Sequence, residues 1–156
     1  MKFVFFIALI SLLQALPAVA QQTKQFKSWN PERDSSDVIE GRLAPAERNN
    51  FYGRLPSKAK SLVREDVWNL SKNTAGLQLR FRTDADEIII RYTVSGGLQF
   101  QHMPATGVSG IDLYSKTIDG GWLWAAGKYN FADTIVYKFS NLSSQDQHVN
   151  NREYTL

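Results

Sequence analysis

The chain has no cysteine, and only two histidines and two methionines among its 156 residues. Without cysteine there are no disulfide bonds and no thiolate chemistry, so an apolar core has to stabilise the fold. The histidines, His102 and His148, have no second metal-binding side chain at the spacing of known sites, and Asp146 beside His148 is expected to be a solvated loop residue. The sequence therefore predicts no metal site and no cofactor.

No apolar run is long enough to cross a bilayer, which takes roughly 20 residues. The longest run, residues 3–13, follows Lys2 and precedes Pro17-Ala18-Val19-Ala20, an A-x-A cleavage pattern. This combination predicts a cleavable signal peptide over residues 1–20, and it fits a membrane anchor or a buried helix less well. The mature protein is then expected to be periplasmic or secreted and free of the membrane.

Neither charge sign is in large excess. Loss of the signal peptide removes one of the 18 basic residues and none of the 15 acidic ones, which leaves a small positive excess. That balance gives no reason to expect a nucleic-acid partner. The roughly 136 residues that remain are enough for one domain and its core. We expect residues 21–40 to form a polar arm and residues 41–156 to form the domain.

The pattern of the domain is mostly that of short strands. Residues 58–71 allow one short helix, whereas from Gly76 onward apolar and polar residues alternate. Residues 77–82 and 88–94 are predicted to pair as a hairpin across an Asp-rich turn. Further strands are predicted around residues 38–39 and over 111–116, 122–128, 133–139 and 152–156.

Strands of this length, separated by Gly and Asp turns, indicate an all-β fold, a jelly-roll-like antiparallel β-sandwich. The last strand pattern begins at Arg152 and the sequence stops at Leu156. We expect this last strand to be truncated and to leave an open sheet edge.

The stretch from His102 to Tyr114 holds a His, a Ser and an Asp close together. A hydrolase triad is one interpretation, with Ser109 as the nucleophile. However, Gly107-Val108-Ser109-Gly110 lacks the G-x-S-x-G spacing and leads into a strand rather than a helix, which favours a glycine-defined loop. In the strand that follows, Asp112 either caps this loop or lies on a face that meets another domain.

Tryptophan offers a second candidate site. Trp122 and Trp124 share one face of their predicted strand, and their rings are suited to stacking on sugars. The alternative, which is the commoner role of large aromatic residues in a sandwich, is packing in the core or at a domain interface.

The segment Gly110-Ile111-Asp112-Leu113-Tyr114 resembles the GxDLY signature of a domain that precedes the catalytic domain in secreted bacterial SGNH/GDSL-type esterases. The stretch from Gly53 to Gly97 is similar to the same domain. The resemblance covers roughly residues 41–156 and implies a jelly-roll-like domain followed by an α/β hydrolase domain of the same polypeptide. The signature positions that it carries over, as structural or domain-interface residues, are His102, Pro104, Gly107, Gly110, Asp112 and Tyr114.

The catalytic blocks of that family are a Gly-Asp-Ser nucleophile block and a late Asp-x-x-His, and neither occurs here. The resemblance therefore implies no catalytic residue in this chain. It implies a non-catalytic domain that packs against an acyl or acetyl esterase acting on carbohydrate and extends the cleft of that esterase. The alternative is a stand-alone secreted carbohydrate-binding module that stacks sugars on Trp122 or Trp124. A hydrolase that uses Ser109 is a third reading.

Overall fold

The computed structural model describes residues 24–34, 38–45, 47, 49–142 and 152–156. The predicted signal peptide, residues 1–20, lies outside this part of the chain, and so do Asp146 and His148. No helix within the described ranges has the length and apolar character needed to span a bilayer.

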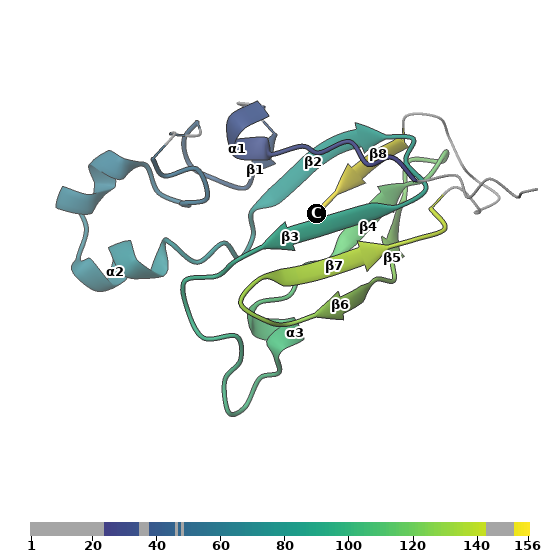
Figure 1. Ribbon diagram of the computed structural model, residues 1–156. Helices are drawn as coiled ribbons and strands as arrows, with labels where there is room; N and C mark the ends of the chain where they lie inside the picture. Colours follow the sequence, from purple (N-terminus) through teal and green to yellow (C-terminus); the bar gives the residue numbers. More distant parts are fainter. Residues whose placement is uncertain (1–23, 35–37, 46, 48, 143–151) are drawn as a thin grey trace, which may run out of the picture.

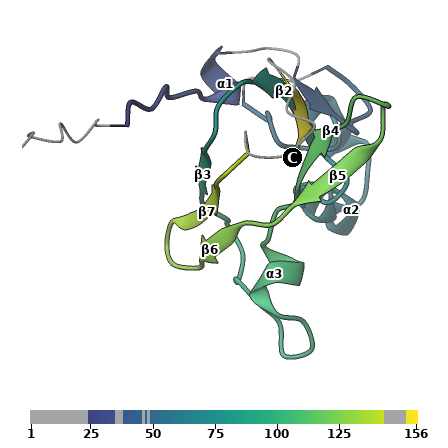
Figure 2. The ribbon, with the colours of Figure 1, turned by 90° about the vertical axis from the view of Figure 1, so that its right-hand side faces the viewer.

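Two antiparallel sheets lie face to face and form a β-sandwich, which confirms the predicted fold class (Figures 1 and 2). In spatial order, the larger sheet consists of β1 (Ile39–Glu40), β2 (Gln78–Thr83), β8 (Arg152–Thr155), β4 (Leu113–Lys116) and β5 (Trp122–Ala125). The smaller sheet consists of β3 (Ile88–Tyr92), β7 (Ile135–Phe139) and β6 (Lys128–Asn130).

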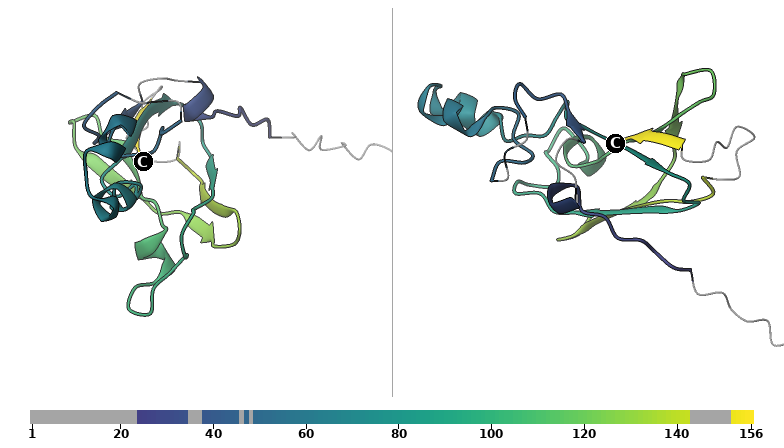
Figure 3. Two further views of the ribbon diagram at one scale, coloured as in Figure 1. Left: turned by 90° about the vertical axis from the view of Figure 1, so that its left-hand side faces the viewer. Right: turned by 90° about the horizontal axis from the view of Figure 1, so that it is seen from above.

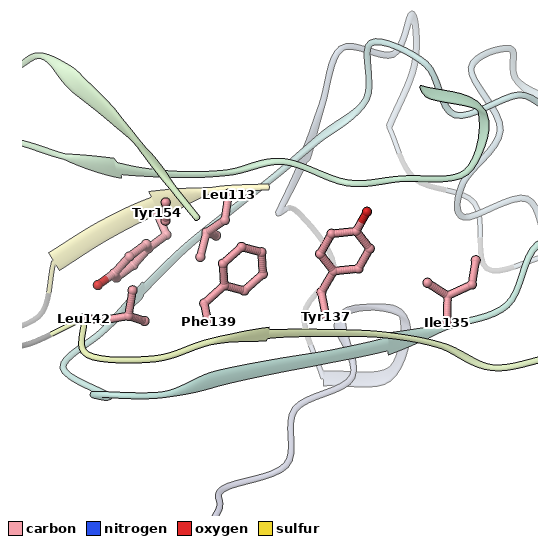
Figure 4. Packing of buried hydrophobic residues seen from close by; sticks show 7 residues of the cluster. Leu113, Ile135, Tyr137, Phe139, Leu142 and Tyr154 are labelled. Carbon is pink, nitrogen blue, oxygen red and sulfur yellow. The ribbon is translucent and has the colours of Figure 1, made fainter. Parts of the chain in front are cut away.

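The core lies between the two sheets and follows from alternation along the strands. Ile135, Tyr137 and Phe139 on β7 are all buried, as the period of two predicts. Leu113 of β4 and Tyr154 of β8 point toward them from the larger sheet, and both are fully buried (Figure 4). The apolar face of each sheet is thus covered by the other sheet.

The predicted hairpin of residues 77–82 and 88–94 is wrong. Both strands form, but β2 pairs with β1 and β8, whereas β3 pairs with β7 in the other sheet. The connection after Thr83 therefore crosses from one layer to the other. Alternation along the chain fixes which side chains are buried but does not distinguish a neighbour in the same sheet from one across the core.

The predicted strand 122–128 also divides between the sheets. β5 ends at Ala125, and β6 begins at Lys128 in the smaller sheet. Gly127 lies at this crossing, where a Cβ atom would come within 2.6 Å of the Phe139 ring. The chain can pass this close to the core only without a side chain.

The last strand does not leave an open edge, contrary to our expectation. β8 lies between β2 and β4, with Tyr154 opposite Phe81 on one side and Ser115 on the other. The edges of the larger sheet are β1 and β5. Strand order places the end of the sequence in the middle of the sheet, which no local pattern reveals.

The helical segments are short. Residues 58–71 form two pieces instead of one helix, the 3-10 helix η2 (Ser57–Ser61) and α2 (Glu65–Leu70). The break falls at Arg64, which is extended and precedes Glu65 and Asp66 in the first turn of α2, where acidic side chains favour a helix start. Two more helices, α1 (Pro31–Asp34) and α3 (Ala105–Val108), have four residues each.

The connection between β1 and β2, residues 41–77, forms a lobe that extends beyond the end of the sandwich (Figure 3). Two glycines close its base. Gly41 has φ +86°, and a Cβ on Gly41 would lie 2.1 Å from the carbonyl oxygen of Gly76. Position 41 therefore requires glycine for its conformation and for its space.

The predicted arm is attached to the sandwich. Trp29 packs against Phe81, with ring centroids 5.7 Å apart. Lys24 forms an ion pair with Glu87, with 3.5 Å between Nζ and Oε2. Residues before position 41 thus contact the same sandwich as the rest of the domain.

Candidate functional site on the signature loop and outer sheet face

The signature loop, residues 98–112, leads from the smaller sheet to β4 in the larger sheet and contains α3. The carbonyl of Pro104 accepts hydrogen bonds from the N–H groups of Gly107 and Val108, which forms the single turn of α3. Pro104 itself is extended and begins this turn with no free N–H. His102, Pro104 and Gly107 all lie on the exposed side of the loop.

Ser109 is a buried anchor of this loop. Its hydroxyl donates to the carbonyl of Leu98 at 3.0 Å, and its carbonyl accepts a hydrogen bond from the Tyr92 hydroxyl at 2.5 Å. Burial raises the pKa of Tyr92, so this phenol stays protonated and remains a donor. The loop is therefore tied to β3 of the smaller sheet.

Gly110, the first residue of the signature, lies where a side chain has no room. A Cβ there would come within 2.2 Å of the Thr106 carbonyl oxygen and 2.9 Å of the Tyr137 hydroxyl. Burial also raises the pKa of Tyr137, although a backbone hydrogen bond from Ile111 acts in the opposite direction. The glycine lets a tyrosine of β7 reach the backbone just before β4 begins.

Asp112 lies on the outer face of the larger sheet, the face turned away from the smaller sheet. Its carboxylate accepts a hydrogen bond from the Trp124 indole N–H at 3.0 Å. The carboxylate of Asp112 was expected either to cap the glycine-rich turn or to face another domain. The observed bond leads to β5 and not to the turn, so it is not a loop cap. Tyr114, two residues further on, is directly opposite Trp124 on the same face.

The signature and the domain around it are matched by a known protein family. The family model GxDLY, described as the "N-terminus of Esterase_SGNH_hydro-type", matches residues 26–156. The chain belongs to this family. No curated protein and no solved structure matches it.

The GxDLY match begins at residue 26, so it includes Trp29, which packs on the sandwich. The residues of the signature have different environments in this structure. Gly110 leaves room for the Thr106 carbonyl and the Tyr137 hydroxyl. Asp112 and Tyr114 are exposed on the outer face, and Leu113 is fully buried in the core. The signature therefore joins the core to one outer surface.

Beside the signature, the outer face of this GxDLY domain carries a charge network around Glu153. Lys116, Arg82 and Arg80 place a nitrogen atom 3.4, 3.1 and 3.7 Å from its carboxylate. Burial raises the pKa of Glu153, but the two cations Lys116 and Arg82 outweigh it, so the net shift of the pKa is downward. Glu153 is thus a charged anchor for three cations.

Residues of this network line a shallow hollow of about 370 Å³. Its lining residues are Val38, Glu40, Arg80, Phe81, Arg82 and Glu153. Arg80 forms a further ion pair with Glu40 at 3.0 Å. The hollow is lined by positively charged hydrogen-bond donors, Arg80 and Arg82, and by negatively charged acceptors, Glu40 and Glu153.

Neither tryptophan of the candidate sugar platform belongs to the core. Trp122 is 39 % exposed and Trp124 is 59 % exposed. Lys116 and Arg80 lie over the Trp122 ring, 5.6 and 5.9 Å from its centroid. Trp124, by contrast, is fixed through its N–H by Asp112, and most of its surface is accessible to a ligand.

The Ser, His and Asp of this stretch, which the sequence analysis weighed as a triad and did not favour, have no contact with one another that would form a catalytic relay. Ser109 bonds to Leu98, Asp112 bonds to Trp124, and the ring of His102 stacks on Phe100 with centroids 5.9 Å apart. Each of the three side chains has a different partner. Within the described ranges, no three His, Asp or Glu side chains gather in a way that could hold a metal ion.

Sequence reasoning missed Tyr92, Tyr137 and the network around Glu153. In the sequence the two tyrosines occupy positions typical of the buried face of a strand. The residues around them give no sign that their hydroxyl groups reach a loop more than 15 residues away in sequence. Arg80 and Arg82 lie on the same strand, but their partner Glu153 lies on β8, more than 70 residues later in the sequence.

Proposed function

We propose that this chain is the non-catalytic N-terminal domain of an exported SGNH-type ester hydrolase. The observation that carries the proposal is the match of the GxDLY family to residues 26–156. The signature residues of this chain either contact other parts of the domain or are exposed on its surface. The sequence contains neither the Gly-Asp-Ser block nor the Asp-x-x-His block of the SGNH type. The chemistry would belong to a catalytic domain of the same polypeptide.

In this proposal the two domains have separate roles. The catalytic domain would cleave an acyl ester through a serine acyl-enzyme with its own oxyanion hole. The GxDLY domain would pack against it and extend its cleft. Export is inferred from the signal-peptide pattern of residues 1–20.

We further propose that the ester is carried by carbohydrate. Support comes from the outer face, where Trp124 is exposed, oriented by Asp112 and directly opposite Tyr114. Aromatic rings offer apolar faces to sugar rings, and the charged groups around Glu153 can bond sugar hydroxyls. The same face supports the second candidate function, a stand-alone carbohydrate-binding module.

Reading the gene beyond the codon for Leu156 is the first test of the esterase assignment. A frame that continues into a Gly-Asp-Ser block and a late Asp-x-x-His is the expected result, and the encoded protein should hydrolyse p-nitrophenyl acetate. Replacing the serine of that block by alanine should abolish the activity. A stop codon directly after Leu156 would overturn the assignment and put the binding module first.

Sugar binding is tested separately on the mature chain. Tryptophan fluorescence is titrated with soluble xylan, mannan and cellulose oligosaccharides, and Trp124→Ala is expected to lose the response. Trp68→Ala is the control, because Trp68 is another tryptophan of the domain but lies on α2 in the lobe instead of on the outer face. Equal responses of the wild type and Trp124→Ala would contradict the platform.

A further inference from the structure

The lobe, residues 41–77, exposes several large apolar side chains. The exposed fractions are 82 % for Leu43, 79 % for Leu62, 60 % for Leu70 and 37 % for Val67. α2 has no buried residue, and Val67 and Leu70 are three residues apart on it, so they share one face. Single exposed apolar residues are ordinary, but a group of them on one small lobe indicates an interaction surface.

Hydrogen bonds that do not involve these side chains hold the lobe together. Arg54 links its two halves, with its backbone N–H donating to the Ser71 carbonyl at 3.0 Å and its guanidinium donating to the Leu70 carbonyl at 2.7 Å. The Glu47 carboxylate accepts from the N–H of Ser57 at 3.0 Å. The exposed leucines are therefore available to a partner and are not needed as a core for the lobe.

Hydrogen bonds also place the apolar positions on adjoining segments. The N–H of Leu43 donates to the carbonyl of Arg54 at 3.4 Å, and Arg54 in turn holds Leu70. Leu62 caps η2, and η2 contacts α2. The backbone segments that carry these four side chains are thus linked to one another.

The position of the lobe indicates what covers it. Leu156, after β8, exchanges two backbone hydrogen bonds of 2.9 Å with Leu79, close to the base of the lobe. A domain joined to Leu156 would therefore begin close to the base of the lobe. Two exposed apolar residues, Phe100 and Met103, belong to the signature loop, and β3 before this loop runs toward the side of the sandwich that carries the lobe (Figure 1).

We propose that the apolar side chains of the lobe, Leu43, Leu62, Val67 and Leu70, dock the SGNH-type catalytic domain. This inference rests on the proposed function, because the family description names an esterase N-terminus. The lobe sequence has seven Arg or Lys residues and three Asp or Glu residues. The matching surface on the catalytic domain would therefore be apolar with an acidic rim.

The test uses the complete encoded protein and an amine-reactive cross-linker. In the wild type, Lys58 and Lys60 of η2 are expected to cross-link to the catalytic domain, whereas Lys128 on β6 is not. The Leu62→Glu/Leu70→Glu variant should reduce those cross-links by about tenfold or more, since each buried leucine contributes strongly to association. Small-angle scattering should then show a larger radius of gyration.

Ile118→Glu is the matched control, because Ile118 is 73 % exposed but lies in the β4–β5 turn at the far end of the sheet. This variant should keep the wild-type cross-links and radius. If the double variant fails to fold, the wild-type cross-links of Lys58 and Lys60 still decide the question.

Several results would overturn the docking surface. One is a catalytic domain that is present and active but gives no cross-link to Lys58 or Lys60. Another is lobe-dependent binding to vesicles of anionic phospholipid, and a third is lobe-dependent dimerisation seen by light scattering. In each of these cases the gene sequence and the esterase assay would still support the proposed function. A failure of the docking surface can therefore be told apart from a failure of the proposed function.

Discussion

The Trp124 indole N–H donates a hydrogen bond to the Asp112 carboxylate across the β4–β5 pair, with 3.0 Å between nitrogen and oxygen. The acidic residue of the GxDLY signature thus orients an exposed aromatic ring. Gly110, two residues earlier, lies against the Tyr137 hydroxyl from the opposite sheet. Five consecutive residues therefore connect the loop, the core and the outer face.

The bond between Asp112 and Trp124 should contribute measurably to stability. Asp112→Ala removes the acceptor and is expected to lower the free energy of unfolding by about 1 kcal/mol. Asp112→Asn keeps an oxygen acceptor and should lie closer to the wild type. Urea denaturation followed by circular dichroism provides the measurement, and equal stability of all three proteins would show that the bond contributes nothing.

Position 110 should accept only glycine. In Gly110→Ala the new methyl group meets the Thr106 carbonyl at 2.2 Å, so the loop or Tyr137 has to move. We expect a loss of about 3 kcal/mol, in the range of overpacked cores. The matched control is Gly96→Ala, where no atom lies within 4 Å of the added Cβ, and it should stay within about 0.5 kcal/mol of the wild type.

A stable Gly110→Ala protein would mean that the signature glycine is not a packing requirement. Its role would then lie in contact with a partner, and the loss would appear in domain docking instead of unfolding.

Ser109→Ala should affect stability and leave chemistry unchanged. The variant removes a buried hydroxyl that donates to the Leu98 carbonyl at 3.0 Å, and we expect a loss of about 1–2 kcal/mol. Ser61→Ala is the control, since its hydroxyl bond to Lys58 is long and exposed. Esterase activity of the complete protein should be retained in full. Loss of activity in a folded Ser109→Ala protein would revive the reading of Ser109 as a nucleophile.

The sequence predicted local features of this fold well. The alternation of Ile135, Tyr137 and Phe139 places all three in the core, and strands form within the predicted ranges 111–116 and 133–139. Such features depend on neighbours in the chain, so a pattern of a few residues contains them.

Features that depend on distant pairing were not predictable in this way. The hairpin of β2 with β3 and the open edge at Arg152 both failed, because strand order is set by packing across the whole sandwich. For the site, the signature residues were found through resemblance, whereas Tyr92 and Glu153 were missed. Their partners are 17 and more than 35 residues away in sequence.

The network on the outer face should make stability depend on acid pH. The net pKa of Glu153 lies below its ordinary value of 4.5, because Lys116 and Arg82 outweigh the burial that raises it. A carboxylate with a depressed pKa in the folded state stabilises the fold above the unfolded pKa, and this contribution is lost as the pH falls through the folded pKa.

Glu153→Gln should therefore be less stable at neutral pH and should lose less stability than the wild type between about pH 5 and pH 3. Glu87, whose pKa is lowered by the hydrogen bond from Lys138, leaves part of the acid dependence in place. Thermal unfolding across this range provides the measurement, and parallel curves for the two proteins would mean that Glu153 gains nothing from its three cations.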